Sequence, residues 1–339
     1  MKTVLITLLV FGLIIMIHEL GHFIAAKLFR VRVNEFSLGM GPSLFCRTVG
    51  ETEYRLRLLP IGGFVAMEGE NENSDDLGAF CNHPAWQRLI ILVAGASMNL
   101  LLGLAVIGIL VSRQELVGTT TVAQFYPEAV SSRWLQPNDT ILAVNGSRVN
   151  GYHDVIFQMM RDQDGSIDFR VKRGAETLTL TGVQFETTEV SEGMRSTVLD
   201  FNFYGVEKTF LNSLEYTVDW TVSIAKQVWY SLGDIIRGRY GLNQLSGPVG
   251  TSAAIGEAAA QGSSSLIMLL AFITVNVGVF NLLPVPALDG GRLIFVLLEL
   301  ITGRAVPQKY ESVIHTAGFL LLMGLVVTVT FNDIIKLIF

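Results

Sequence analysis

Charged side chains are scarce in this chain of 339 residues. Asp, Glu, Lys and Arg make up 16% of it, against about 25% in ordinary soluble proteins. Hydrophobic residues make up 50%, and the mean hydropathy is +0.47. So few charges cannot cover the surface of a soluble protein of this length, and the composition therefore predicts a membrane protein.

Cysteine and clustered basic residues are also nearly missing. The chain has two cysteines, Cys46 and Cys81, which is too few for a disulfide framework. The net charge is -6 and no cluster of Lys and Arg stands out, so no nucleic-acid partner is expected. No internal repeat or low-complexity tract is visible, which leaves no indication of a solenoid or a linker protein.

The chain contains four long runs with almost no charged residue. Residues 89–112, 266–288 and 314–331 carry no Asp, Glu, Lys or Arg, and residues 4–26 carry only Glu19. Each run approaches or exceeds the roughly 18 to 20 residues that cross a hydrocarbon core about 30 Å thick. We therefore predict four transmembrane helices and a lipid bilayer as the environment.

The first run has an alternative interpretation as a secretory signal. Lys2 precedes it, and the small residues Ala25 and Ala26 follow it. The run is long for a signal peptide, and Lys27 and Arg30 directly after it favour an uncleaved anchor.

Basic residues indicate how the chain is oriented. They concentrate between the first and second runs and occur again between the third and fourth, so both of these loops are expected on the cytoplasmic side. Both termini are then extracytoplasmic. The basic residues of the first loop are Lys27, Arg30, Arg32, Arg47, Arg55, Arg57 and Arg88.

A region of different composition follows the second run, and we expect a small extracytoplasmic domain there. "PNDTILAVNGSRV" predicts two strands around Asn145-Gly146, and "SIDFRVKRGAETLTLTGV" predicts a hairpin around Arg173-Gly174. "YHDVIFQMMRDQ" between them has helical spacing. This order resembles a PDZ domain, although residues 137–139 stand where such domains usually have a Gly-Asp pair. A generic small β domain is the alternative.

An amphipathic helix is predicted from Glu207 to Arg237, where apolar residues recur at near-helical spacing with charges between them. Such a helix either lies on the outer membrane surface or packs on the soluble domain, and the sequence does not choose between the two.

Three titratable residues interrupt the first apolar run. His18, Glu19 and His22 form the pattern H-E-x-x-H, which on a helix places both imidazoles on one face, where they can ligate one Zn²⁺. Glu19 would then take a proton from the water at the metal. A charged group at membrane depth costs at least about 2.5 kcal/mol, so such groups are functional by default. The alternative is that they make hydrogen bonds and ion pairs between helices.

A third ligand is expected, because catalytic zinc sites have three protein ligands and one open position. Asp289 is the candidate. It follows Pro284 and Pro286, which interrupt the third run, and broken backbone at membrane depth is tolerated only where it is buried in protein or lines a wet cavity. Asp289 could also cap the helix that restarts near Arg292. The other histidines are less suited by position: His83, His153 and His315.

Five motifs together resemble the site-2 protease family of intramembrane zinc metalloproteases, of the RseP/RasP type. They occur in the family's order: "HELGH", "AGASMN", one PDZ-like insertion, "SGPVG" and "NLLPVPALDGG". Ala96 stands where related sequences often have proline, and the chain has one PDZ-like domain where some relatives have two. These departures concern how substrates are admitted more than the chemistry.

The resemblance implies a role for each matching residue. His18, His22 and Asp289 are the zinc ligands, and Glu19 is the catalytic base. Asn281 and Asn276 contact the substrate backbone. The stretch 53–70, with Gly62 and Gly63, resembles a membrane-re-entrant β-hairpin that offers an edge to an unwinding substrate helix.

The implied activity is regulated intramembrane proteolysis in the bacterial cytoplasmic (inner) membrane. A zinc-bound water would attack a peptide bond in a single-span membrane protein, such as an anti-sigma factor or a signal-peptide remnant. The PDZ-like domain would act as a size filter or read a new carboxy terminus. A membrane metal transporter and a catalytically inactive PDZ-bearing scaffold are the alternative classes.

The expected fold class is a polytopic α-helical membrane protein with a cytoplasmic re-entrant hairpin and an inserted PDZ-like α/β domain. Its expected divisions are helix one (1–30), a loop with the hairpin (31–88), helix two (89–112), the PDZ-like domain (113–200), an amphipathic helix and connection (201–265), broken helix three (266–300), a loop (301–312) and helix four (313–339).

Overall fold

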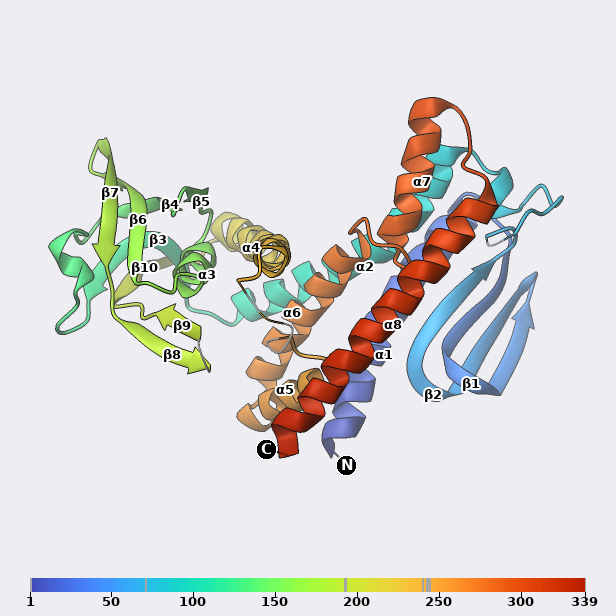
Figure 1. The fold of residues 1–339 in the computed structure, drawn as a ribbon, viewed down its shortest axis with the longest axis horizontal. Helices are drawn as coiled ribbons and strands as arrows, with labels where there is room; N and C mark the ends of the chain where they lie inside the picture. Colours follow the sequence, from blue (N-terminus) through green and yellow to red (C-terminus); the bar gives the residue numbers. More distant parts are fainter. Residues whose placement is uncertain (1, 71, 192–193, 240, 242–244, 339) are drawn as a thin grey trace. The chain divides into compact units, whose positions relative to one another are not determined.

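The computed structural model describes residues 2–70, 72–191, 194–239, 241 and 245–338 (Figure 1). The chain forms two compact units. One contains Met1–Val106 and Val228–Phe339, and the other contains Ile107–Gln227.

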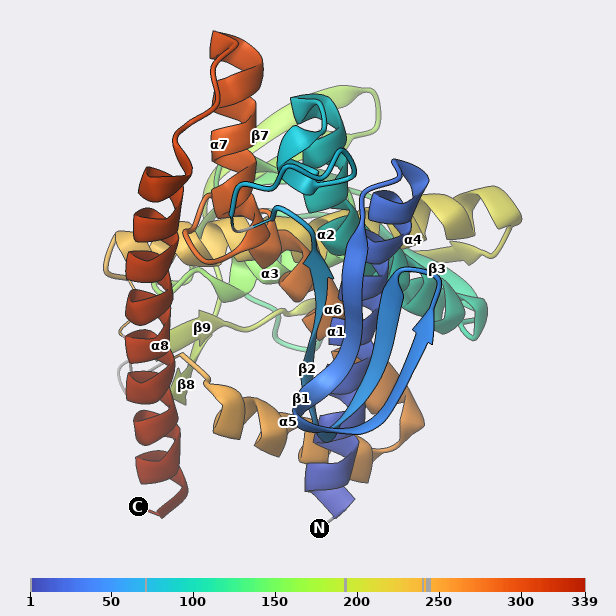
Figure 2. The same cartoon turned by 90° about the vertical axis from the view of Figure 1, so that its right-hand side faces the viewer.

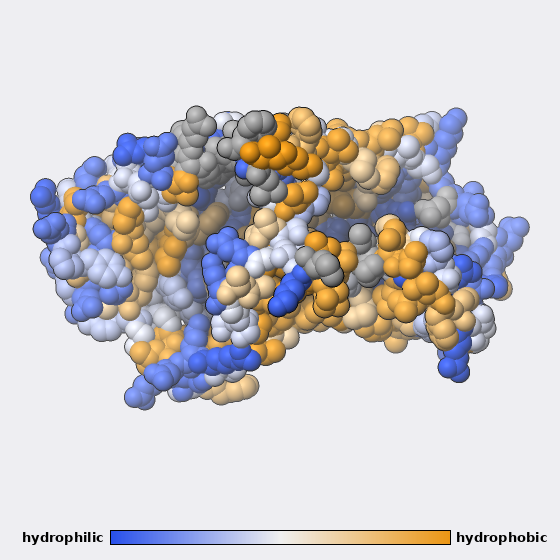
Figure 3. Space-filling model, turned by 90° about the horizontal axis from the view of Figure 1, so that it is seen from below, coloured by the Kyte–Doolittle hydropathy of each residue, from blue (hydrophilic) through white to orange (hydrophobic). Residues whose placement is uncertain are grey.

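The first unit is mostly helical. Four helices of the described chain are long and apolar enough to cross a membrane, which confirms the number expected from the uncharged runs. Figure 3 shows broad apolar patches on the surface, and the exposed side chains of the last helix include Leu320, Leu321 and Val327. Exposed leucine and valine at this density fit a lipid-facing surface. The four helices are α1 (Lys2–Leu28), α2 (Ala85–Ser112), α6 (Ser263–Asn281) and α8 (Gln308–Ile338).

The third apolar run is not one continuous helix. Helix α6 ends at Asn281, residues 282–288 are not helical, and α7 (Asp289–Thr302) begins a new helix. Pro284 and Pro286 lie in the break, where each lacks the N–H that a helix would need. Asp289 is therefore the first residue of α7. Helix α5 (Pro248–Gln261) was not predicted, because this part of the chain was expected to be a connection.

A β-hairpin packs beside α1 (Figure 2), but its bounds differ from those expected. Its strands are β1 (Val33–Val49) and β2 (Thr52–Met67), so the stretch 53–70 supplies one strand rather than the whole hairpin. The turn is at Gly50, whose φ of 63° is in the left-handed region. The other strand was missed because the alternation of apolar and polar residues in 33–49 is confined to Phe36–Met40, and the turn-forming pair Gly41-Pro42 follows it.

The end of β2 forms an outer edge of this hairpin. Ser37 of β1 is opposite both Phe64 and Arg55 of β2, so the first part of β1 lies between two segments of the same strand. Val65 and Met67 pack with Val33 and with Ala26 of α1 in one apolar cluster. The edge segment 63–67 is thereby fixed against the helix that carries the two histidines.

The second unit is built on a six-stranded sheet of order β10-β3-β4-β6-β7, with β5 paired to β4. Alternate residues Ile167, Phe169 and Val171 of β6 are fully buried, as expected for a strand with one face on a core. The strand pair around Asn145-Gly146 and the hairpin at Gly174 are both present. Both Asn145 and Gly146 have positive φ, as a tight hairpin turn requires.

The sheet extends beyond residue 200, where the domain was expected to end. Strand β10 pairs with β3, and the buried Phe201 joins the core, so this segment belongs to the sheet rather than to a connection. The elements of this part of the chain are β3 (Leu116–Phe125), η2 (Ser131–Arg133), β4 (Thr140–Val144), β5 (Ser147–Arg148), α3 (Tyr152–Met160), β6 (Ser166–Arg173), β7 (Glu176–Gln184), β8 (Thr187–Ser191), β9 (Met194–Thr197), β10 (Phe201–Glu207) and α4 (Phe210–Ile236).

The first half of α4 packs on α3, which is one of the two alternatives for the amphipathic segment. His153 stacks on Trp220 with ring centroids 4.2 Å apart, and its Nε2 lies 3.0 Å from the hydroxyl of Tyr216. Lys226 Nζ donates to the buried Asp154 Oδ2 at 2.9 Å. Contact of α4 with the membrane surface stays a prediction.

Acid is expected to destabilise this contact between α3 and α4. Burial lowers the pKa of His153 to about 4, so the folded unit keeps the imidazole neutral while the unfolded chain protonates it below about pH 6.5. Stability therefore falls as the pH drops from about 7 to about 5, by up to about 2 kcal/mol. Amide hydrogen exchange of α3 at the two pH values, corrected for intrinsic rates, measures the effect.

His153→Phe is the control for this prediction, because it keeps an aromatic ring on Trp220 and removes the titrating group. The acid-dependent part of the exchange should disappear in this variant. An equal pH dependence in both proteins would show that His153 is not its source.

Candidate metal centre

Helix α1 brings two imidazoles together. His18 and His22 are four residues apart, so they lie one turn apart on the same helical face. Both are buried, with 8% and 7% of their surface exposed, and their Nε2 atoms are 3.2 Å apart. Two buried imidazole nitrogens facing each other at this distance need a proton or a metal ion between them.

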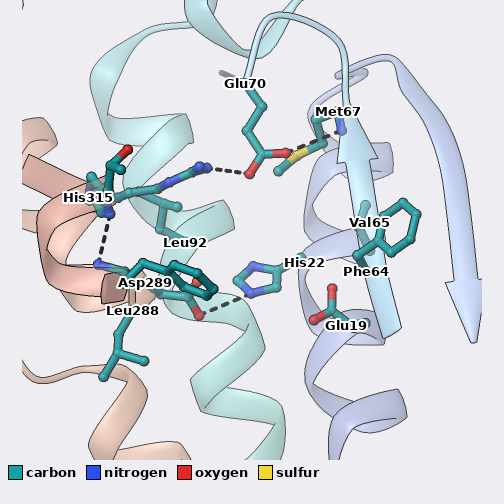
Figure 4. A pocket seen from close by; sticks show the side chains of 14 residues that line it. Glu19, His22, Phe64, Val65, Met67, Glu70, Leu92, Leu288, Asp289 and His315 are labelled. Carbon is teal, nitrogen blue, oxygen red and sulfur yellow. Dashed lines mark hydrogen bonds and ion pairs between the residues drawn. The ribbon is translucent and has the colours of Figure 1, made fainter. Parts of the chain in front are cut away.

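The break after α6 brings Asp289 to the same place. Its Oδ2 atom lies 3.2 Å from His22 Nε2 (Figure 4) and 3.0 Å from His18 Nε2, although 267 residues or more of chain separate it from either histidine. Gly290 and Gly291 allow the chain to turn here: a Cβ on Gly290 would lie 2.0 Å from the carbonyl oxygen of Leu283. The two glycines after the aspartate are therefore part of what positions its carboxylate.

The three atoms suit a tetrahedral zinc ion. Ligands about 2.1 Å from a tetrahedral zinc are about 3.4 Å from one another, close to the 3.0 to 3.2 Å separations between His18, His22 and Asp289. Two imidazoles and one carboxylate are a common ligand set of catalytic zinc. Among the described residues this is the group of His, Cys, Asp and Glu side chains that could hold a metal ion.

Backbone and amide groups of α2 hold the two rings. His22 Nδ1 is 2.8 Å from the carbonyl oxygen of Ile91, so Nδ1–H donates there and Nε2 keeps a free lone pair. His18 Nδ1 is 3.4 Å from Nδ2 of the fully buried Asn99, whose Oδ1 has no partner among the described residues. Exchanging the two amide atoms of Asn99 would let its oxygen accept the Nδ1–H of His18.

Asn99 was not identified from the sequence, where it only completes the motif "AGASMN". No local spacing links it to His18, because the two residues lie on different helices 81 positions apart. The sequence feature that could have identified Asn99 is its position as a polar residue within an apolar run.

Glu19 lines a cavity of about 440 Å³ together with His22 and Asp289 (Figure 4). Glu19 is not part of the group that could hold a metal ion, so its carboxylate can interact with a molecule bound in the cavity. The edge segment of β2 forms one wall through Phe64 and Val65. A glutamate, two members of the group that could hold a metal ion and the edge segment of β2 therefore meet at one cavity.

The expected substrate-binding residues are divided between two places. A Cβ on Gly63 would lie 3.6 Å from Glu19 Cγ, so Gly63 is beside the metal centre, and Gly62 next to it has a φ of 82°. Asn276 and Asn281 instead line a separate cavity of about 560 Å³. Asn276 donates through Nδ2 to the carbonyl of Phe272 in its own helix.

Two residues that the sequence did not single out as functional also line the metal-site cavity. His315 of α8 accepts a hydrogen bond at Nδ1 from the backbone N–H of Ala287, at 3.0 Å. Arg292 forms an ion pair with Glu70, which follows β2. Both contacts join segments far apart in the chain, and neither residue belongs to a recognisable pattern.

A unit of apolar helices with two buried histidines, a half-buried aspartate beside them and an adjacent glutamate defines a membrane-bound metallohydrolase. Comparison with known proteins makes this specific: the model of peptidase family M50 matches residues 6–325, and the chain belongs to this family. The resemblance to site-2 proteases is thereby confirmed, and the chain is a zinc-dependent metalloendopeptidase of the membrane.

Individual relatives agree with this assignment. A zinc metalloprotease of Clostridium perfringens is 38% identical over 336 residues, which cover 98% of both chains. A zinc metalloprotease of Fusobacterium nucleatum is 34% identical and covers 99% of both. The regulator of sigma-W protease RasP of Bacillus subtilis is 27% identical, again over 99% of both.

Proposed function

We propose that this chain cleaves peptide bonds inside the transmembrane segments of single-span membrane proteins, with His18, His22 and Asp289 holding the zinc ion. The observation that carries the proposal is the single cavity lined by Glu19, His22 and Asp289 within a unit of apolar helices. A hydrolytic site in such a unit meets substrates that are themselves in the membrane.

Glu19 is the general base. His18, His22 and Asp289 would hold a zinc ion whose Lewis acidity would lower the pKa of the attacking water and polarise the scissile carbonyl. Glu19 lines the cavity without belonging to the ligand group, so one carboxylate oxygen is free to accept the proton and then deliver it to the leaving amine. His22, held through Nδ1 on Ile91, keeps its position while the proton moves.

The substrate binds as an extended strand along the edge of β2. A helical segment hides its amides in its own hydrogen bonds and must unwind before attack, which exposes backbone N–H and C=O groups. The edge segment 63–67 has no further strand partner among the described residues and lies along the cavity wall, so it can pair with that backbone. Gly63 leaves room beside Glu19, because a Cβ there would lie 3.6 Å from Glu19 Cγ, and Gly62 precedes it with a φ of 82°.

Asn276 and Asn281 act away from the cleavage point. They line the second cavity with Phe272 and Phe280, so in this proposal they contact a part of the substrate that has not yet reached the metal. The apolar surroundings suit a segment that is still helical. The side-chain amides of the two asparagines can hydrogen-bond the first backbone groups that become exposed as this segment unwinds.

The proposed location is the bacterial cytoplasmic membrane, with the metal centre near the cytoplasmic face and both termini and the PDZ-like unit outside. The basic residues after α1 support this orientation. One relative is named for regulating sigma-W, so an anti-sigma factor is a reasonable substrate, as is a signal-peptide remnant. The PDZ-like unit then excludes substrates with bulky outer domains or reads a new carboxy terminus.

Cleavage of a defined membrane substrate tests the proposal. The purified protein in liposomes is expected to cut a single-span protein with a short outer segment, and to cut the same span poorly when a folded domain is attached outside. Asp289→Asn should lose both zinc and cleavage, because an amide replaces the one anionic ligand.

Three outcomes would contradict it. Cleavage that is indifferent to chelators would exclude the metal chemistry, and zinc retained in Asp289→Asn would exclude this ligand set. Transport of zinc across the liposome membrane without cleavage would favour the transporter alternative.

A further inference from the structure

Helix α8 contacts the non-helical segment that ends at the ligand Asp289, and it does so at two points one turn apart. His315 accepts the N–H of Ala287, and Gly318 packs against Pro286. Only 6% of the most apolar window of α8 is buried, so contacts of this kind are few along the helix. Both fall on the segment 282–288.

This segment needs outside support. Ala287 has a φ of 74°, a left-handed conformation that costs a non-glycine residue roughly 1 kcal/mol or more. The N–H groups of Leu282, Leu283, Val285 and Leu288 donate to backbone carbonyls within or next to the segment, but the N–H of Ala287 has its partner on α8, at His315. A backbone held in this conformation persists only where its surroundings fix it.

His315 provides a directed contact. Its Nδ1 lies 3.0 Å from the Ala287 nitrogen, so Nδ1 is the acceptor and the ring proton sits on Nε2. That Nε2 is buried and has no hydrogen-bond partner among the described residues. A polar atom buried in this way is unfavourable, so the histidine is not explained by packing alone.

Gly318 provides a close contact on the same helical face. A Cβ at this position would lie 2.3 Å from Pro286 Cβ and 2.9 Å from the carbonyl carbon and oxygen of Pro286. The glycine therefore lets the backbone of the segment approach α8 directly. A methyl group here would push the segment away from α8, two to three residues before the ligand.

We infer that His315 and Gly318 position the metal ligand Asp289 by fixing the segment 282–288 in its left-handed turn. His315 is a positioning residue in this inference, since its bond is to the backbone of Ala287. The inference rests on the proposed ligand set. It predicts that two changes on α8, neither at a ligand, weaken zinc binding.

Zinc affinity of the purified full-length protein, measured by competition with a chelator, is the test, and it needs no substrate. His315→Phe keeps the ring beside Phe295 and removes the acceptor, so zinc should bind about tenfold more weakly. His315→Asn restores an acceptor near the Nδ1 position and should recover most of that loss. Thr328→Val removes a hydrogen bond within α8 itself and should change nothing.

Gly318→Ala is the second arm, and Gly324→Ala is its matched control. Both add one methyl group to α8, but the Cβ at Gly324 meets no atom within 4 Å. Gly318→Ala should bind zinc at least about tenfold more weakly than wild type. Gly324→Ala should bind it as wild type does. With free zinc buffered by a chelator below the dissociation constants of the variants, the maximal cleavage rate should fall with zinc occupancy, while KM stays unchanged.

The outcomes distinguish a wrong role for His315 and Gly318 from a wrong ligand set. If Asp289→Asn still binds zinc, the proposed ligand set is wrong. If Asp289→Asn loses zinc while His315→Phe and Gly318→Ala bind it as wild type does, the ligand set stands and the inference is overturned. Equal losses in His315→Phe and His315→Asn would also overturn it, because the acceptor would then not matter.

Discussion

Glu19→Gln is expected to reduce cleavage by about a thousandfold while zinc stays bound at wild-type stoichiometry. A general base contributes about 10²- to 10⁴-fold to such a reaction, and glutamine cannot accept the proton. Glu19 lies outside the ligand group of His18, His22 and Asp289, so its replacement leaves the metal in place. Glutamine also matches its size in the wall next to Gly63.

Cleavage rates on a single-span substrate and zinc content of the same preparation measure this pair of effects. Glu51→Gln is the matched control, because Glu51 makes an exposed ion pair with Lys27 and does not line the cavity. Exposed pairs contribute little, so this variant should cleave normally. Full cleavage by Glu19→Gln would exclude Glu19 as the base, and loss of zinc would show that it acts as a ligand.

The sequence predicted the parts of the site that depend on local spacing. His18 and His22 meet because residues four apart share a helical face, and the break before Asp289 follows from two prolines in an apolar run. The four membrane helices followed from the length of uncharged runs.

Contacts between distant segments could not be predicted in the same way. Strand β1 was missed because its alternating residues are few and are followed by Gly41-Pro42, although its pairing with β2 holds the edge segment beside the candidate metal centre. Strand β10 was assigned to a connection because its membership of the sheet depends on pairing with β3, about 80 residues earlier. Asn99 and His315 acquire their roles from helices that pack on the site, and helix packing leaves no short pattern in one sequence.

Gly95 lies where α2 passes the ligand atom of His22. A Cβ at this position would be 2.3 Å from His22 Nε2 and 2.7 Å from Cε1. Real Cβ atoms do not approach so closely, so the ring would have to move. The bond from Nδ1 to the carbonyl of Ile91 opposes that movement, since Ile91 is on the same helix one turn earlier.

Gly95→Ala is therefore expected to weaken zinc binding by at least about a hundredfold and to abolish cleavage. Alanine is otherwise favoured over glycine in a helix by about 1 kcal/mol, so the change should not unfold α2. Gly108→Ala on the same helix is the control, because its Cβ would meet only Thr217 Cγ2 at an ordinary 3.8 Å. Wild-type zinc affinity in Gly95→Ala would mean that His22 does not hold the metal in the orientation described.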